Sequence, residues 1–183
     1  MSNERNLDTF SELAVPLLGS LYNFAHWLSR DPTEAEDLVQ ETYAKALKGF
    51  STFQLGTNFR AWMFRILRNT WLTSKTGLAA KMTVPMEEDT PEPADEQTPE
   101  SVLLDNIARE TVQQAIEQLA PAYREVLLLC DVEEMSYADI AQTLDIPIGT
   151  VMSRLSRARK AVRETVQTEW RVASSGRVQS SGR

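Results

Sequence analysis

Cysteine and histidine are nearly absent from this chain of 183 residues, which has one of each. A single cysteine can form neither an internal disulfide nor a cysteine metal cluster. Cys130 lies in the apolar run VLLLC, which favours a buried thiol, and His26 lies between apolar neighbours, which favours a packed histidine over a catalytic one. The sequence also has no nucleophile–base set, glycine-rich phosphate loop or metal-ligand spacing. We therefore expect no metal, no cofactor and no catalytic residue, and a protein that is not an enzyme.

Long apolar runs are missing as well. No stretch approaches the roughly 20 apolar residues of a membrane span, and the N-terminus has no signal-peptide pattern. Hydrophobic residues still make up 42% of the chain, enough for packed cores in one ordinary domain or two small ones. We expect a cytoplasmic protein without membrane insertion.

The net charge of −7 is unevenly distributed along the chain. Residues 1–76 carry no net charge, residues 77–100 carry −6, residues 101–134 carry −5, and residues 135–183 carry +4. A basic C-terminal part therefore lies behind an acidic middle, so the acidic overall charge does not exclude a nucleic-acid partner.

Residues 136–163, SYADIAQTLDIPIGTVMSRLSRARKAVR, have the pattern of a helix-turn-helix. Ser136 and Asp139 form a capping pair that predicts the start of a short helix. Pro147 removes a backbone donor and the glycine two residues later permits a turn, so the first helix ends there. Thr150 then restarts a helix with its hydroxyl near the open N–H groups.

The second helix of this motif combines a buried stripe with a basic face. Its apolar residues recur at helical spacing: Val151, Leu155, Ala158 and Val162. Arg154 to Arg163 includes five basic residues and no acidic one, which suits phosphate neutralisation. Polar side chains near the N-terminal end are placed to read base edges: Thr150, Ser153, Ser156 and Arg157. A solvated basic face on an ordinary core helix is the alternative, but the capped helix, the turn and the basic helix together favour DNA binding.

The N-terminal part predicts helices over residues 7–30 and 31–50. Pro16 kinks the first or marks the start of its main part. Asp31 caps the second and Glu34 completes the cap. Its inner face is apolar apart from one threonine: Ala35, Leu38, Val39, Thr42, Ala46, Leu47 and Phe50. Its outer face is polar, and periodicity alone indicates simple solvation there: Glu36, Asp37, Gln40, Glu41, Lys45 and Lys48.

Aromatic and basic residues alternate in the next helix, FRAWMFRILRNTWLTSK, which follows an exposed loop over residues 51–58 that holds Phe53. One face suits a core: Phe59, Trp62, Met63, Ile66 and Thr70. A second face carries Arg60, Phe64, Arg68 and Trp71, and a third carries Arg65 and Asn69. Aromatics interleaved with arginines suit unstacked bases and their backbone. An amphipathic helix whose aromatics simply form the core is an equal alternative.

The predicted fold class is all-α, with two small helical domains joined by a flexible acidic linker. The first domain spans residues 1–76, and residues 77–100 form a linker rich in proline and acid. Residues 101–170 form a compact four-helix module with helices at 101–119, at 121–132 and in the helix-turn-helix. Residues 171–183 are expected to be a disordered tail.

Two helical modules in this order resemble an extracytoplasmic-function (ECF) sigma factor of bacterial RNA polymerase, in the sigma-70 family. DPTEAEDLVQETYAKAL resembles region 2.2, FRAWMFRILRNT resembles regions 2.3–2.4, and SYADIAQTLDIPIGTVMSRLSRARKAV resembles region 4.2. GTNFRAW further resembles stress-response members that zinc-containing anti-sigma proteins hold. The resemblance implies promoter-specific transcription initiation, in a stress response under anti-sigma control.

The resemblance also implies site residues. Four residues would dock on the β′ clamp coiled coil of core RNA polymerase, with the β flap as a further contact: Asp37, Gln40, Glu41 and Lys45. The −10 element would be held and melted by Phe53, Gln54, Asn58, Arg60, Trp62, Arg65 and Asn69. The −35 element would be read by Thr150, Ser153, Ser156 and Arg157, with Arg154, Arg159 and Lys160 on phosphates.

The chain departs from relatives at the melting helix. Trp62 and Met63 stand where housekeeping relatives have two aromatics, so melting should tolerate fewer promoters. Thr73 stands where some relatives have an asparagine facing the −10 bases.

Three alternatives differ in class. A helix-turn-helix repressor or activator would need a dimer interface or ligand pocket, and a sigma-mimicking regulator that forms no holoenzyme would usually add a receiver domain. A helical scaffold without nucleic acid would not explain the charge segregation.

Overall fold

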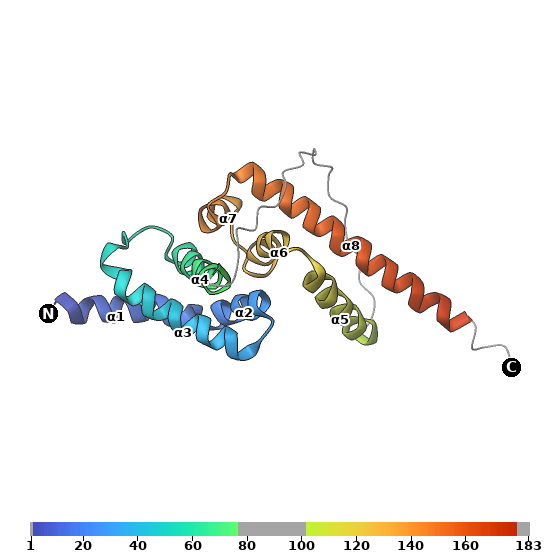
Figure 1. Cartoon of the computed structure of the whole chain (residues 1–183), viewed down its shortest axis with the longest axis horizontal. Helices are drawn as coiled ribbons and strands as arrows, with labels where there is room; N and C mark the ends of the chain where they lie inside the picture. The colour runs from blue at the N-terminus through green and yellow to red at the C-terminus, as the bar shows by residue number, and fades with distance from the viewer. Residues whose placement is uncertain (1, 77–101, 179–183) are drawn as a thin grey trace. The chain divides into compact units, whose positions relative to one another are not determined.

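The computed structural model describes residues 2–76 and 102–178, and within these ranges every regular element is helical (Figure 1). The elements follow in this order: α1 (Ser2–Ala14), η1 (Val15–Leu17), α2 (Leu18–Ser29), α3 (Pro32–Gly49), η2 (Phe50–Thr52), α4 (Phe59–Thr76), α5 (Val102–Gln118), α6 (Pro121–Leu127), η3 (Leu128–Val132), α7 (Tyr137–Leu144) and α8 (Ile148–Val178). The all-α prediction is confirmed. The predicted linker, residues 77–100, lies outside the described residues.

The described elements form two compact units. The first contains α1 to α4 together with η3 and α7, and the second contains α5, α6 and α8. This division differs from the predicted domain limits, because residues 128–148 group with the first unit. Where a disordered tail was expected from residue 171, α8 continues to Val178.

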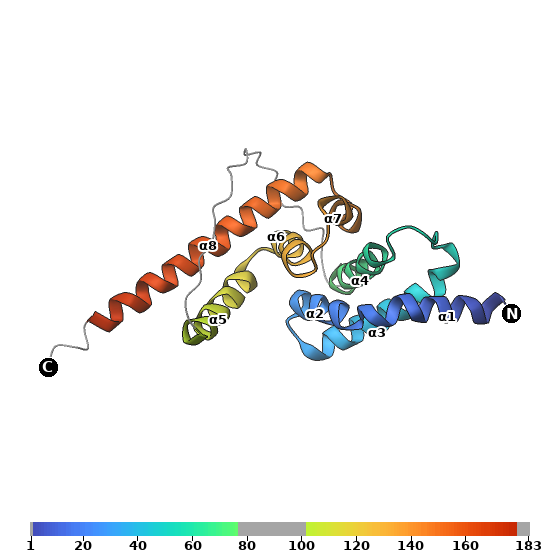
Figure 2. The ribbon, with the colours of Figure 1, turned by 180° about the vertical axis from the view of Figure 1, so that it is seen from behind.

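The core of the first unit lies among α2, α3 and α4. Helix α3 packs against both α2 and α4, as two opposite views show (Figures 1 and 2). Phe24 of α2 and Phe64 of α4 are fully buried, with ring centroids 5.4 Å apart. Leu21, Met63 and Leu67 are also fully buried. Burial of such side chains contributes roughly 1.5–3 kcal/mol each, which makes this core the support for the exposed faces of α3 and α4.

Pro16 breaks the first predicted helix, as expected, and α1 and α2 are joined by the 3-10 turn η1. In this turn the N–H of Leu18 donates to the carbonyl of Val15 instead of that of Ala14. The Tyr43 hydroxyl of α3 donates to the carbonyl of Ala14 at 2.6 Å, which ties α3 to the end of α1 at this break.

The predicted cap of α3 is confirmed in one half and wrong in the other. The Asp31 carboxylate accepts a hydrogen bond from the Glu34 N–H at 2.8 Å. The Glu34 carboxylate does not complete the cap, because it pairs with Lys75 of α4 at 2.8 Å, and the Asp31 N–H donates to the Ser29 hydroxyl at 3.3 Å. The inner face is buried except for Leu47, which is 44% exposed. Leu47 follows buried Ala46 by one residue, which turns it about 100° away from the buried stripe.

In the second unit, a buried arginine bonds to the C-terminal end of α5. Arg124 of α6 is 4% exposed and donates to three carbonyls at the end of α5, those of Ile116, Glu117 and Leu119, at 3.2, 2.6 and 2.8 Å. The Ile116 carbonyl also accepts from the Leu119 N–H at 3.2 Å, and carbonyls at the end of a helix have fewer backbone donors than those inside it. The helix predicted over residues 121–132 is confirmed, with the difference that its last five residues form the π-turn η3.

The start of α7 agrees with the predicted cap, whereas the turn after it does not. The Ser136 hydroxyl accepts from the Asp139 N–H at 3.1 Å and donates to the Asp139 carboxylate at 2.7 Å. The left-handed residue that ends α7 is Asp145, with φ of 55°, a conformation that aspartate tolerates better than most residues. Helix α8 begins at Ile148, so Gly149 lies inside its first turn and is not the turn residue that the sequence suggested.

Candidate nucleic-acid interface

Helix α8 presents the polar and basic face that its sequence predicted. Val151, Leu155 and Ala158 are at most 2% exposed, and Val162 is half-buried. The predicted −35 residues are all exposed or half-buried: Thr150, Ser153, Arg154, Ser156, Arg157, Arg159 and Lys160. The Ser153 hydroxyl donates to the Thr150 carbonyl at 3.1 Å. Fixed positive charge along one helix face, with short polar side chains near its N-terminal end, has the chemistry needed for phosphate and base contacts.

The loop before α4 is exposed as predicted, except that Phe53 packs on an aromatic cluster and is half-buried. Its ring centroid lies 5.0 Å from that of Trp62 and 5.2 Å from that of Phe59, and it stacks on Phe50 at 6.0 Å. The Phe53 N–H donates to the Phe50 carbonyl at 3.0 Å, which closes the loop locally. Phe53 and Trp62 nevertheless keep part of their surface open, and Gln54 beside them is exposed.

Asn58 caps α4, a role that was not predicted from the sequence. Its side-chain oxygen accepts from the Ala61 N–H at 3.0 Å, which makes it the N-cap of α4. The signal was present in the sequence, because asparagine directly before an apolar helical run is a common cap. The structure therefore explains Asn58 without a DNA contact.

The predicted second face of α4, with alternating arginines and aromatics, does not exist as an exposed surface. Phe64 is 0% and Trp71 6% exposed, so both belong to the core. The third face is exposed as predicted and carries Arg65 and Asn69, continued one turn later by Thr73. The Thr73 hydroxyl donates to the Asn69 carbonyl at 2.8 Å. We refer to Arg65, Asn69 and Thr73 as the reading face of α4.

Arg60 does not join the reading face. Its guanidinium donates to the carboxylate of Glu133, which is 5% exposed, and lies over the Phe64 ring at 5.6 Å from the centroid. Glu133 follows η3 in the same compact unit and lies 73 positions away in sequence. No local pattern could have indicated this pair.

Helix α7 packs on α4 next to this ion pair. The Thr143 hydroxyl donates to the Ala61 carbonyl, and the Arg68 guanidinium donates to the Leu144 carbonyl, each at 3.4 Å. Of the residues predicted for the −10 element, the structure therefore groups Phe53 with Trp62, and Arg65 with Asn69, while Arg60 and Asn58 are engaged in internal contacts.

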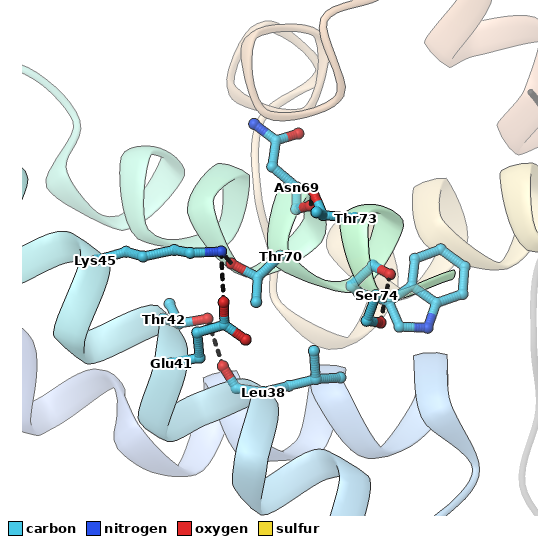
Figure 3. A network of polar contacts seen from close by, with 9 residues as sticks. Leu38, Glu41, Thr42, Lys45, Asn69, Thr70, Thr73 and Ser74 are labelled. Atoms are coloured by element: carbon cyan, nitrogen blue, oxygen red, sulfur yellow. Dashed lines mark hydrogen bonds and ion pairs between the residues drawn. The ribbon is translucent and has the colours of Figure 1, made fainter. Parts of the chain in front are cut away.

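The outer face of α3 is exposed at all four predicted docking positions, Asp37, Gln40, Glu41 and Lys45. Three of them offer acidic or amide oxygens to solvent. Lys45 differs, because its ammonium group lies 2.7 Å from the Glu41 carboxylate and donates to the Thr70 hydroxyl of α4 at 3.2 Å (Figure 3). We refer to Asp37, Gln40 and Glu41 as the docking face of α3.

In the part of the chain that the structure describes, no group of three or more histidine, cysteine, aspartate or glutamate side chains could hold a metal ion. No helix in the described ranges is both long and apolar enough to cross a membrane.

Comparison with known proteins matches both modules. The family model for sigma-70 region 2 matches residues 13–79, and the model for sigma-70 region 4 matches residues 109–162. The chain is 32% identical over 160 residues to the ECF RNA polymerase sigma factor SigE of Mycolicibacterium smegmatis, covering 86% of this chain and 62% of that protein. It is 35% identical over 162 residues to the RNA polymerase sigma-H factor of Pseudomonas aeruginosa, covering 82% of this chain and 80% of that protein.

A solved structure is similar over nearly the whole chain. The sigma factor RpoE of Bartonella quintana, in complex with the anti-sigma factor NepR, superposes with a TM-score of 0.66 at 30% sequence identity. The match covers 87% of this chain and 97% of that one. With both sigma regions matched in order and relatives above 30% identity, the chain belongs to the ECF sigma factors of the sigma-70 family.

Proposed function

We propose that this sigma factor binds core RNA polymerase and directs initiation at promoters through separate contacts with the −35 and −10 elements. The observation that carries the proposal is the division of α8 into a buried apolar stripe and an exposed basic and polar face. The packing of α8 does not explain the five exposed or half-buried basic residues from Arg154 to Arg163, whereas binding to a polyanionic duplex does. A sigma factor has no catalytic activity of its own, so its function depends on binding to polymerase and to promoter DNA.

For the −35 element, Thr150, Ser153, Ser156 and Arg157 read bases in the major groove. Arg154, Arg159 and Lys160 contact phosphates. This assignment rests on the short polar side chains near the N-terminal end of α8 and the basic ones farther along. Base contacts then supply sequence preference, and phosphate contacts supply affinity that salt weakens.

For the −10 element, an unstacked base lies against the half-exposed rings of Phe53 and Trp62, beside Gln54, and the adjoining strand follows the reading face of α4. Stacking on an aromatic ring contributes about 1–3 kcal/mol per base. Arg60 contributes only when its contact with Glu133 opens, and Asn58 contributes by starting α4.

For the polymerase, the docking face of α3 binds the clamp coiled coil of the β′ subunit. Its side chains project from a well-capped helix whose other side is the core of the first unit. A rigid support of this kind lets polar side chains dock without a cost in ordering the backbone. The β flap is the second polymerase contact that we assign.

The chain is also proposed to be held inactive by an anti-sigma protein. The support is its similarity to Bartonella quintana RpoE, which was crystallised with the anti-sigma factor NepR. A regulator that resembles sigma factors but forms no holoenzyme is the competing reading.

The docking face provides the test. We expect Asp37→Arg with Glu41→Arg to abolish binding to core polymerase in a pull-down, because both positions are exposed and the substitutions reverse the charge of the docking face. The matched control is Asp8→Arg with Glu12→Arg, an equally exposed pair at the same spacing on α1. Helical circular dichroism should be unchanged in both. Retained assembly of the α3 variant, or no assembly of the unaltered chain, would contradict the proposal.

A further inference from the structure

Lys45 connects the two functional faces of the first unit. Its side chain extends from α3 to α4, where the ammonium group contacts Glu41 at 2.7 Å and donates to the Thr70 hydroxyl at 3.2 Å (Figure 3). Glu41 belongs to the docking face, and Thr70 directly follows Asn69 of the reading face. Among the described residues, no other member of the predicted docking set forms a hydrogen bond or ion pair with α4.

Thr70 has a reason to need this contact. The residue is 2% exposed, and a buried hydroxyl without a hydrogen-bond partner is costly. Lys45 supplies a donor from a partly exposed position, its side chain being 44% exposed. With Glu41 and Thr70 both engaged, two of the three ammonium hydrogens are used in contacts within the chain, which leaves one for an external partner.

The contact holds one residue of α4, Thr70, toward α3. Successive helical residues are turned by about 100°, so holding Thr70 toward α3 places Asn69 on the exposed side. Thr73, one turn farther on, bonds to the Asn69 carbonyl at 2.8 Å and shares that orientation. A small rotation of α4 would therefore move the whole reading face.

We propose that Lys45 is a positioning residue, which orients the reading face of α4 and links it through Glu41 to the docking face of α3, and that it is not itself a polymerase contact. This inference rests on the proposed function. Glu41 is 55% exposed, and a carboxylate accepts several hydrogen bonds at once, so Glu41 can hold Lys45 while it docks. Polymerase bound at α3 would thereby stabilise the orientation in which α4 reads the −10 strand.

The experiment separates binding of polymerase from use of the −10 element. The variants are Lys45→Met, which keeps the stem and removes the charge, Thr70→Val, which keeps the shape and removes the hydroxyl, and the double variant. Core affinity is measured by titration with the full-length chain. Open-complex formation is measured at saturating polymerase by permanganate footprinting, on a promoter located by run-off transcription of genomic DNA.

We expect each single variant to bind core within about two-fold of the unaltered chain and to lower open-complex formation about three-fold, the effect of losing one net hydrogen bond. The double variant should be no worse than either single one, because both remove the same contact. Thr70→Ser, which keeps the hydroxyl that Thr70→Val removes, should form open complexes as well as the unaltered chain does. Lys48→Met, the same change at an exposed lysine of α3, should alter neither measurement.

A direct polymerase role for Lys45 predicts the reverse. In that case Lys45→Met would weaken core binding while Thr70→Val had no effect, and the inference would be wrong. Additive losses in the double variant would equally overturn it. Failure of the unaltered chain to bind core would instead refute the proposed function, so the two failures are distinguishable.

Discussion

At the scale of single residues, several side chains bond to backbone carbonyls at helix ends. Tyr43 is the clearest case, because its hydroxyl donates to the Ala14 carbonyl at the end of α1, just before the Pro16 break. Burial also raises the pKa of the Tyr43 phenol above its usual value of 10.0.

Replacing Tyr43 by phenylalanine should lower the free energy of unfolding by about 1 kcal/mol, since the hydrogen bond from its hydroxyl to the Ala14 carbonyl is lost. The pH dependence should change as well. As pH rises past 10.0, the unfolded chain loses the phenolic proton before the folded chain does, so stability falls toward the higher folded pKa. Urea unfolding at pH 8 to 11 measures both effects, and Tyr43→Phe should show the flatter decline. Tyr137→Phe, at an exposed tyrosine, is the control; equal behaviour of the two variants would contradict this role for Tyr43.

The −35 assignment makes a second residue-scale prediction. Arg157→Ala should weaken binding to the promoter's −35 duplex by about 1–3 kcal/mol and should reduce the preference over scrambled DNA. Lys160→Ala should instead weaken binding to both duplexes alike and flatten the salt dependence. Fluorescence anisotropy over a salt series distinguishes the two. An unchanged preference in Arg157→Ala would remove that residue from the base-reading set.

At the scale of elements, the predictions from the sequence that succeeded concern local interactions, although the cap from Glu34 and the turn at Gly149, also local, were wrong. The caps at Asp31 and Ser136 join residues three positions apart, so residue types alone indicate them. The buried stripe and basic face of α8 likewise follow from helical periodicity. The pair of Arg60 with Glu133 spans 73 positions, and no periodicity encodes it. The burial of Phe64 and Trp71 was equally ambiguous, because an arginine-rich aromatic face suits either bases or a core.

The long-range pair gives the element-scale prediction. Glu133→Ala should lower the stability of the first unit by about 1.5–3 kcal/mol, because Arg60 would lose its charge-assisted hydrogen bond. Glu134→Ala removes the same side chain from the neighbouring, exposed position and should have little effect. The free energies of urea unfolding check this. Equal stability of the two variants would mean that the Arg60–Glu133 contact contributes nothing measurable.

At the scale of the whole molecule, the division of charge corresponds to a division of partners. The basic excess lies in residues 135–183 and the strongest acidic excess in residues 77–100. DNA is a polyanion, so it attracts a segment with a basic excess and repels one with an acidic excess. Membership in the ECF family followed from the order of its motifs, whereas the grouping of residues 128–148 with the first unit depends on tertiary packing.

The central claim is that this chain confers promoter specificity on core RNA polymerase. The most direct measurement is in vitro run-off transcription of the organism's genomic DNA by core polymerase, with and without the full-length chain. We expect a small set of discrete start sites that appear only with the chain, and their loss with Asp37→Arg/Glu41→Arg. Transcripts that are identical with and without the chain would contradict the claim.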